Sequence, residues 1–286
     1  MTRGRRSVLI TGASTGIGAA SVKRLAAAGW RVYASVRRPE DEDRLRGLTG
    51  DVTPVRLDVK DPARIEGVAQ RIQEDLGDAG LDALVNNAGI AVAGPLEFLP
   101  IAELRDQLEV NLVGQVAVTQ ALLSALRRAR GRIVFVGSIA GRSAMPVTGA
   151  YSASKFGIEA VADALRVELR PWHIRVTVVE PGAFASAIWE TGRRRADRVA
   201  PDLPRELEAY YGSVLRAVRR VAQRAETARP PDAVARVIEH ALNTRRPRAR
   251  YLVGNDARFR LLIERLLPVR LRDAVIANRL RRLGED

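Results

Sequence analysis

The sequence predicts an α/β fold, a doubly wound domain in which a seven-stranded, mostly parallel sheet carries helices on both faces. Two observations support this prediction. Short runs of β-branched residues alternate with longer segments of helical periodicity, which is typical of β-α-β units. The strand-like runs are almost continuously apolar, as expected for strands buried on both faces. The expected strands cover residues 7–10, 31–36, 53–57, 83–85, 132–136, 175–179 and 250–253.

Helical periodicity places helices between these strands. Pro62 follows Asp61 at a position that suits a first helical turn, and Gly29 stands where a C-terminal cap belongs. No internal repeat or low-complexity linker divides the chain. We therefore expect one domain over residues 1–254, with an arginine-rich insertion at 183–229, followed by an extension at 255–286. The expected helices cover residues 16–28, 62–76, 101–128, 151–170 and 232–242.

Composition narrows the classes of function. The chain has 286 residues and a net charge of +14, so a nucleic acid or a membrane surface is a first candidate partner. It has no cysteine and two distant histidines, which excludes disulfides and thiol nucleophiles and offers no ligand set for a metal. The chain lacks an apolar run of about 18 residues, so no membrane-spanning helix is predicted. We expect a cytoplasmic protein, peripheral to a membrane at most.

A glycine-rich turn follows the first strand and opens the first helix. Glycine lets the backbone approach a phosphate, and a helix N-terminus supplies free N–H groups. The spacing Gly-x-x-x-Gly-x-Gly lacks the lysine of a P-loop, so NTP hydrolysis is not supported. A tight turn without a ligand is the alternative, but its place in the first β-α-β unit favours a dinucleotide. The candidate pyrophosphate ligands are Gly12, Ser14, Thr15, Gly16, Ile17 and Gly18.

Two arginines, Arg37 and Arg38, follow the second strand. This position selects the cofactor in dinucleotide-binding folds, because an acidic residue binds the ribose hydroxyls of NAD whereas a guanidinium suits the 2′-phosphate of NADP. The chain has no acidic residue at this strand end, which favours NADP(H) over NAD(H), with Arg37 as the phosphate ligand. The alternative is that both are ordinary surface arginines in an arginine-rich chain.

Ser138, Tyr151 and Lys155 form the candidate catalytic group. Ser138 follows the fifth strand, and Tyr151 and Lys155 lie four residues apart on one face of a helix. A free tyrosine titrates near pH ~10, but an adjacent ammonium stabilises the phenolate and lowers its pKa. Tyrosine can then act as the acid/base in a chain almost without histidine. The alternative is an ordinary half-buried helix surface.

Together these motifs resemble those of the short-chain dehydrogenase/reductase family, in the branch with Thr-Gly-x-x-x-Gly-x-Gly and Tyr-x-x-x-Lys motifs. The resemblance covers about residues 5–255, and the motifs follow the family's order and approximate spacing. It implies a single Rossmann-like domain and hydride transfer between a nicotinamide and a substrate carbon. The matching positions are 11–18, 58–59, 86–89, Asn111, Ser138, 151–155 and 181–182.

The resemblance implies a role for each catalytic position. Tyr151 would exchange a proton with the substrate oxygen, and Ser138 would hydrogen-bond the same oxygen. Lys155 would lower the tyrosine pKa and hold the nicotinamide ribose, and Asn111 would hold a water that connects Lys155 to solvent. The further cofactor contacts that it implies are Asp58 and Val59 at adenine, and Asn87, Pro181 and Gly182 beside the ribose and nicotinamide.

Short stretches at 33–35, 77–81 and 178–182 resemble family members that act on steroids and retinoids. This resemblance implies a small hydrophobic alcohol or carbonyl substrate, steroid-, retinoid- or lipid-like, with the segment after Gly182 as a lid. Family members commonly pair through their long helices, so a homodimer or tetramer is expected. The alternative function is a non-catalytic dinucleotide sensor or nucleic-acid-binding protein on the same fold. Few aromatic residues accompany the basic ones, which disfavours nucleic acid.

The positive charge is concentrated near the end of the chain. Residues 1–186 carry +4, whereas residues 187–286 carry +10. The extension at 255–286 has apolar residues at helical spacing with arginines between them, a pattern typical of a helix lying on an anionic membrane surface. The alternative is that the apolar stripe packs on the domain or on a second subunit.

Overall fold

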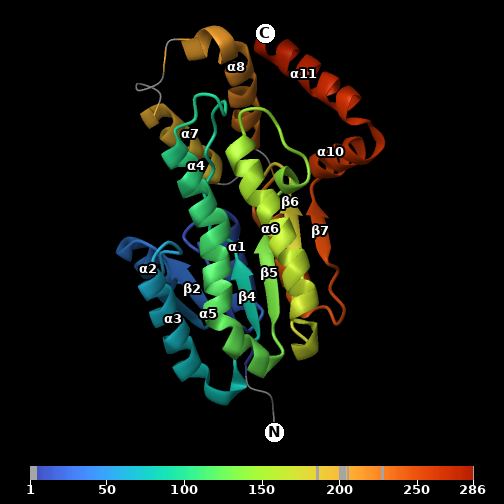
Figure 1. Ribbon diagram of the computed structural model, residues 1–286. Coiled ribbons are helices and arrows are strands. Elements are labelled where there is room, and N and C mark those ends of the chain that lie inside the picture. Colours follow the sequence, from blue (N-terminus) through green and yellow to red (C-terminus); the bar gives the residue numbers. More distant parts are fainter. Residues whose placement is uncertain (1–4, 185–186, 200–203, 205, 227–228, 286) are drawn as a thin grey trace.

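The computed structural model describes residues 5–184, 187–199, 204, 206–226 and 229–285. It confirms the predicted fold class: the sheet has seven parallel strands in the order β3-β2-β1-β4-β5-β6-β7 (Figure 1). All seven expected strands are present, with small shifts at their ends. The strands are β1 Ser7–Ile10, β2 Arg31–Val36, β3 Val52–Arg56, β4 Ala83–Asn86, β5 Arg132–Val136, β6 Arg175–Pro181 and β7 Arg250–Val253.

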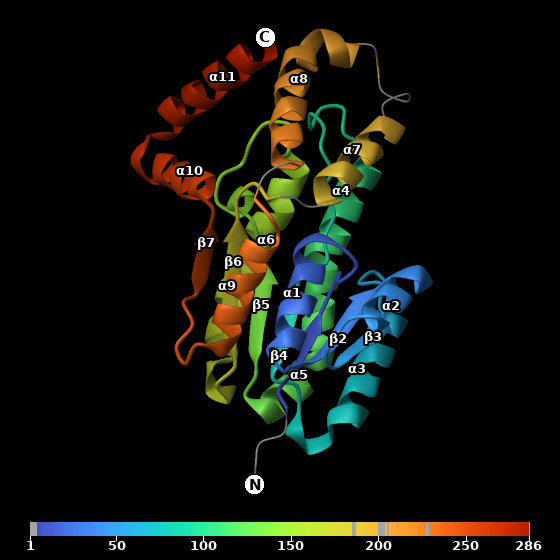
Figure 2. The ribbon, with the colours of Figure 1, turned by 180° about the vertical axis from the view of Figure 1, so that it is seen from behind.

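Helices cover both faces of the sheet (Figure 1, Figure 2). Side chains alternate along β1, so that Leu9 packs with α3, α5 and α6 on one face while Val8 and Ile10 pack with α1 and α9 on the other. Each face buries its own apolar cluster, which explains the unbroken apolar strands. These helices are α1 Gly16–Ala27, α3 Pro62–Leu76, α5 Gly114–Ala129, α6 Gly149–Glu168 and α9 Asp232–Asn243.

Two helical features differ from the expectation. The helix expected at 101–128 is divided into α4, Ile101–Leu108, and α5 by a π-helical turn, η2, at Glu109–Val113. A charged helix, α2 at Pro39–Arg46, follows β2 where none was expected. Within α2 only Asp41 and Leu45 are buried, so the segment lacks the apolar periodicity that reveals a helix in a sequence.

Four further helices lie beyond the carboxyl ends of the strands (Figure 1). The insertion forms α7, Ala187–Val199, and α8, Glu206–Glu226, and the extension forms α10, Asn255–Leu266, and α11, Val269–Glu285. α11 packs on α8, where Leu280 is buried and Arg220 donates a hydrogen bond to the Leu283 carbonyl at 2.7 Å. The extension is therefore joined to the insertion. None of the helices in the described part of the chain is long and apolar enough to cross a membrane.

Candidate active site

A cavity of about 440 Å³ opens at the carboxyl ends of the strands, where open parallel sheets bind ligands. It is lined from the turn after β1, the ends of β2 to β5, α6 and the segment after β6. Gly16, Gly18 and Asn111 do not line it. The predicted site residues that it brings together are Gly12, Ser14, Thr15, Ile17, Arg37, Asp58, Val59, Asn87, Ser138, Tyr151, Lys155, Pro181 and Gly182.

The glycine-rich turn after β1 has no room for side chains at its two critical positions. A Cβ on Gly12 would lie 2.8 Å from the Ala88 Cα, and φ of Gly12 is +65°. A Cβ on Gly18 would lie 2.2 Å from the Gly12 carbonyl oxygen. The backbone therefore forms a close cradle beside the N-terminus of α1, and this cradle fits a dinucleotide pyrophosphate.

Asn87 and Thr11 hold this cradle against the end of β4. The Asn87 Nδ2 donates to the carbonyls of Thr11 at 2.9 Å and of Gly12 at 3.0 Å. The Thr11 hydroxyl oxygen accepts the backbone N–H groups of Asn87 and Ala88, both at 2.9 Å. The Thr11 hydroxyl thus links β1 to the end of β4, which explains the threonine in the motif. The Asn87 amide holds the backbone of the glycine-rich turn.

The end of β3 contributes two of the predicted cofactor contacts. Asp58 and Val59 line the cavity, and their contact with adenine stays a prediction. The Asp58 carboxylate accepts the Lys60 backbone N–H at 3.0 Å, which holds the turn. Gly114 permits the close packing behind it, because a Cβ there would lie 2.5 Å from the Val59 carbonyl oxygen.

Two arginines, Arg37 and Arg38, line the cavity where β2 ends. Arg37 is exposed and has no ion pair within the part of the chain that the structure describes. Arg38 and Arg44 pair with the buried Asp41 carboxylate at 3.3 Å and 2.8 Å. Arg44 also donates to the Ser14 carbonyl in the glycine-rich turn. Sequence reasoning missed Asp41 and Arg44, because it did not predict the helix that carries them.

Ser138, Tyr151 and Lys155 meet in the cavity. Ser138 follows β5, and its hydroxyl oxygen accepts the Ala140 N–H at 3.1 Å in the short helix η3, Ile139–Gly141. Tyr151 and Lys155 lie one turn apart on α6, with the ammonium 5.7 Å from the tyrosine ring centre. The Lys155 Nζ donates to the Val136 carbonyl at 2.8 Å. Three of the four predicted catalytic residues thus line one cavity, and the fourth, Asn111, does not.

Burial governs the charges of this group. It raises the pKa of the Tyr151 phenol, and the hydrogen bond with Ser138 opposes that rise. Burial also lowers the pKa of the Lys155 ammonium to about 8, opposed by the nearby Glu159. The expectation that Lys155 lowers the tyrosine pKa is therefore not met in this structure, where Ser138 is the group that favours the phenolate.

Asn111 lies behind the cavity, in the π-helical turn η2, and is fully buried. Its Oδ1 accepts the Ile90 N–H at 2.8 Å, and its Nδ2 donates to the Ile90 carbonyl at 2.9 Å and to the Ser154 hydroxyl at 3.2 Å. The side chain thus joins the loop after β4 to the helix of Tyr151 and Lys155. π-Helical turns are frequent at functional sites, and the water-binding role of Asn111 stays a prediction.

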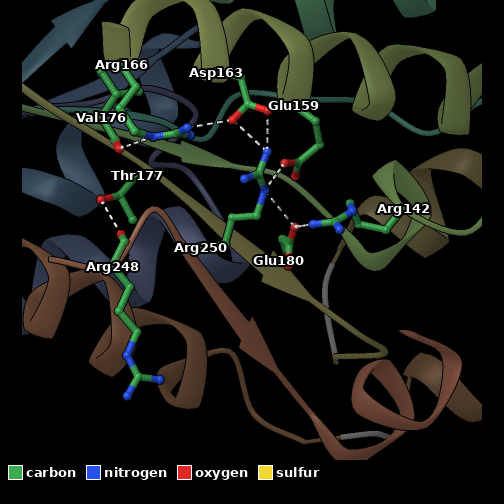
Figure 3. A network of polar contacts seen from close by, with 9 residues as sticks. All are labelled: Arg142, Glu159, Asp163, Arg166, Val176, Thr177, Glu180, Arg248 and Arg250. Carbon is green, nitrogen blue, oxygen red and sulfur yellow. Dashed lines mark hydrogen bonds and ion pairs between the residues drawn. The ribbon is translucent and has the colours of Figure 1, made fainter. Parts of the chain in front are cut away.

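A network of ion pairs surrounds Glu180 and Arg250 (Figure 3). Glu180 directly precedes Pro181 and is almost fully buried, with Arg142 at 3.1 Å and Arg250 at 3.7 Å. Arg250 also pairs with Glu159 on α6 at 2.8 Å. Burial raises the pKa of Glu159 to about 7. The network connects α6, the segment after η3, β6 and β7, and sequence reasoning missed it. Its one signal in the sequence is Glu180, which directly follows the apolar pair Val178 and Val179 in β6.

Apolar residues close the cavity on the side of the insertion. Phe184 is 2% exposed, and it lines the cavity together with Ile188 and Ile90. Arg195 of α7 forms ion pairs with Glu103 and with Asp106 of α4, which hold α7 beside the cavity. This arrangement supplies an apolar wall to the cavity that Tyr151 also lines.

Comparisons with known proteins agree with this geometry. A family model described as short chain dehydrogenase matches residues 6–197. Human retinol dehydrogenase 5 is 37% identical over 277 residues, with 94% of this chain and 87% of the relative covered. Human 17-beta-hydroxysteroid dehydrogenase type 6 is 36% identical over 278 residues, with 95% and 87% covered. A short chain dehydrogenase from Burkholderia cenocepacia, solved in complex with NADP, has a TM-score of 0.70, 25% identity and coverage of 98% and 99%.

The match to the family model and the two dehydrogenase relatives argue against the alternative that the motifs are only structural. The catalytic roles of Ser138, Tyr151 and Lys155 stay a prediction. The relatives also favour an enzyme over the non-catalytic alternative, because they are dehydrogenases of steroid or retinol type. The chain belongs to the short-chain dehydrogenase family and is an NAD(P)-dependent oxidoreductase acting on CH–OH groups.

Proposed function

We propose that the protein is an NADP(H)-dependent oxidoreductase that interconverts an alcohol and a carbonyl on a steroid-, retinoid- or lipid-like substrate. One observation carries the proposal: Tyr151, Ser138 and Lys155 line the same cavity as the glycine cradle. The names of the two human relatives, a retinol and a hydroxysteroid dehydrogenase, support a hydrophobic substrate. The apolar wall with Phe184 and Ile188 supports it as well.

Each catalytic side chain has a distinct part in the proposed reaction. The bound nicotinamide supplies or accepts the hydride. In reduction, the Tyr151 hydroxyl gives its proton to the substrate oxygen. The Ser138 oxygen accepts the Ala140 N–H, and its hydroxyl hydrogen-bonds Tyr151 in this structure. When substrate binds, this single O–H would turn to the substrate oxygen and stabilise the developing charge. Lys155 uses one N–H on Val136 and has two more with which to hold the nicotinamide ribose.

Arg37 is the proposed ligand of the NADP 2′-phosphate. We expect Arg37→Ala to weaken NADPH binding by about 10- to 100-fold while changing NADH binding little, because a charge-assisted hydrogen bond contributes about 1.5–3 kcal/mol. Dissociation constants for both nucleotides, measured by fluorescence titration, test this. Arg46→Ala is the matched control, since Arg46 is exposed on α2 but does not line the cavity. Equal weakening of both nucleotides by Arg37→Ala would remove the NADP assignment.

We also propose that α10 and α11 lie on an anionic membrane surface. Leu266 is 69% and Val269 61% exposed, in a segment that carries several arginines. Their exposed neighbours include Phe259, Leu262, Leu271 and Val275. An exposed apolar stripe flanked by arginines matches a lipid interface in both hydrophobicity and charge. Such contact would place the enzyme where a lipid-like substrate dissolves.

Vesicle binding by the full-length protein tests the membrane contact. We expect the double variant Leu266→Asp, Val269→Asp to lose at least about tenfold in affinity for vesicles containing phosphatidylserine, because each buried apolar side chain contributes about 1.5–3 kcal/mol. Val167→Asp changes an equally exposed valine on α6 and should bind as the wild type does. Undiminished binding by the double variant would refute this contact.

The expected homodimer or tetramer and the cytoplasmic location stay predictions. Support for pairing comes from exposed apolar side chains on the long helical segments, namely Val113 in η2 and Phe156 on α6. Solvent-exposed residues of this size are suited to a subunit interface.

A further inference from the structure

The beginning of α10 contacts both loops that flank the catalytic side of the cavity. α10 follows β7 after one residue, Gly254. The Asp256 Oδ2 accepts the backbone N–H of Ala183 at 2.7 Å. One turn further along α10, the Arg260 Nη2 donates to the Ser143 carbonyl at 2.7 Å. Ser143 belongs to the loop that begins with Ser138, and Ala183 follows the cavity residue Gly182. A single helix thus joins the two loops.

The space around the Asp256 carboxylate is made by glycines. A Cβ on Gly182 would lie 2.2 Å from the Asp256 Oδ2, and a Cβ on Gly254 would lie 2.5 Å from its Oδ1. Gly254 also has φ of +111°, which a residue with a side chain rarely adopts. Any side chain at either glycine would displace the carboxylate from the Ala183 N–H. Gly182 therefore leaves room for the Asp256 carboxylate and also lines the cavity.

The Arg260 side chain is half-buried. Burial lowers the pKa of its guanidinium, with Asp256 and Glu264 opposing that effect. Its Nη2 donates to both the carbonyl and, at 3.3 Å, the hydroxyl of Ser143, and Ser143 is itself buried. Burying a guanidinium costs free energy that these hydrogen bonds offset. This anchor therefore fixes α10 to the loop of Ser138 in one arrangement.

We propose that Asp256 and Arg260 are positioning residues for hydride transfer, and we name their two contacts the α10 latch. The latch sets the distance between the Ser138 loop, which orients the substrate oxygen, and the 181–184 segment, which lies beside the nicotinamide in the proposed function on which this inference rests. The reaction rate depends steeply on the distance between the reacting groups, since a displacement of about 1 Å can lower it about 100-fold. The extension at 255–286 is then part of the catalytic unit as well as a surface element.

The Asp256→Ala and Asp256→Asn variants separate the latch from the charge. Both remove the carboxylate charge in the first turn of α10, but the asparagine carbonyl oxygen can still accept the Ala183 N–H. We expect Asp256→Ala to lower kcat by about tenfold or more, by displacement of the 181–184 segment, and Asp256→Asn to restore most of that loss. Asp273→Ala removes an exposed carboxylate of α11 and should leave kcat unchanged.

A second measurement needs no turnover. Hydrogen–deuterium exchange should show faster exchange of the Ala183 amide in Asp256→Ala but not in Asp256→Asn. Wild-type kcat and wild-type exchange in both variants would overturn the latch. Equal losses of kcat in both variants would overturn it as well, because they would assign the effect to the lost charge. If the wild type turned over no alcohol or carbonyl, the proposed function would fail, while amide exchange and NADPH affinity would still test the latch.

Arg260 provides an independent test of the other contact. We expect Arg260→Met, which fills the half-buried site without donating to Ser143, to lower kcat in the same direction while the Ala183 amide stays protected. Arg265→Met is the matched control, because Arg265 is exposed on the same helix. Full activity of Arg260→Met would remove Arg260 from the latch and leave Asp256 as its only member.

Discussion

Replacement of Tyr151 by phenylalanine should abolish measurable turnover while leaving the fold and NADPH binding intact. The variant retains the ring that packs in the cavity and loses only the hydroxyl that exchanges the proton. General acid–base catalysis contributes about 10²- to 10⁴-fold, so kcat/KM should fall by at least that amount. Steady-state kinetics of carbonyl reduction, together with NADPH fluorescence titration, measure both effects.

Tyr251 offers a control with the same chemical change. It is a half-buried tyrosine on β7 whose hydroxyl oxygen accepts the Arg248 N–H at 3.1 Å, and it does not line the cavity. Tyr251→Phe should lose about 1 kcal/mol of stability at most and no activity. Turnover by Tyr151→Phe at the level of this control would refute the acid/base role of Tyr151.

Replacement of Lys155 by methionine should separate activity from stability. Lys155 is 3% exposed, and methionine has a similar length without the charge. We expect kcat/KM to fall by at least about 100-fold, because the ammonium that is proposed to hold the nicotinamide ribose is lost. Lys23→Met changes an exposed lysine outside the cavity and should be fully active.

The stability of Lys155→Met follows from the pKa of the lysine. That pKa is about 8 in the folded protein, against 10.5 for an unperturbed lysine, so keeping the ammonium charged opposes folding by about 3 kcal/mol below pH ~8. The penalty declines as pH rises from about 8 to 10.5. The lost hydrogen bond to Val136 offsets about 1 kcal/mol.

Denaturant unfolding of both proteins measures this effect. At neutral pH the methionine variant should be at least as stable as the wild type, and its advantage should shrink as pH rises toward 10.5. A variant that is both inactive and much less stable would indicate that Lys155 serves the fold rather than the chemistry.

Much of the fold could be predicted because its signals are local. The strands are visible as apolar runs. The spacing of the glycines marks a turn in which backbone segments lie too close together for side chains. Tyr151 and Lys155 could be paired because four residues make one helical turn. Ser138 could be added because parallel strands end at a common edge. These inferences depend on chain periodicity, which the sequence shows directly.

The remaining features depend on contacts between distant segments. α2 escaped prediction because it has few apolar residues, and with it the Asp41 and Arg44 pair was missed. The Asp256 contact with Ala183 joins residues 73 positions apart, and no periodicity encodes such a pairing. The direction of the Tyr151 pKa could not be predicted either, because it depends on how completely the phenol is buried. In an arginine-rich chain, the sequence also does not show which arginine pairs with which carboxylate.

The most direct test of the central claim follows the hydride. The wild-type protein should be incubated with NADPH deuterated at the transferred position of the nicotinamide and, separately, with retinaldehyde, a ketosteroid, a long-chain aldehyde and a simple ketone. We predict that a hydrophobic carbonyl compound is reduced, and that mass spectrometry finds the deuterium on its new carbinol carbon. The absence of labelled alcohol from every hydrophobic substrate, in protein that binds NADPH, would contradict the account.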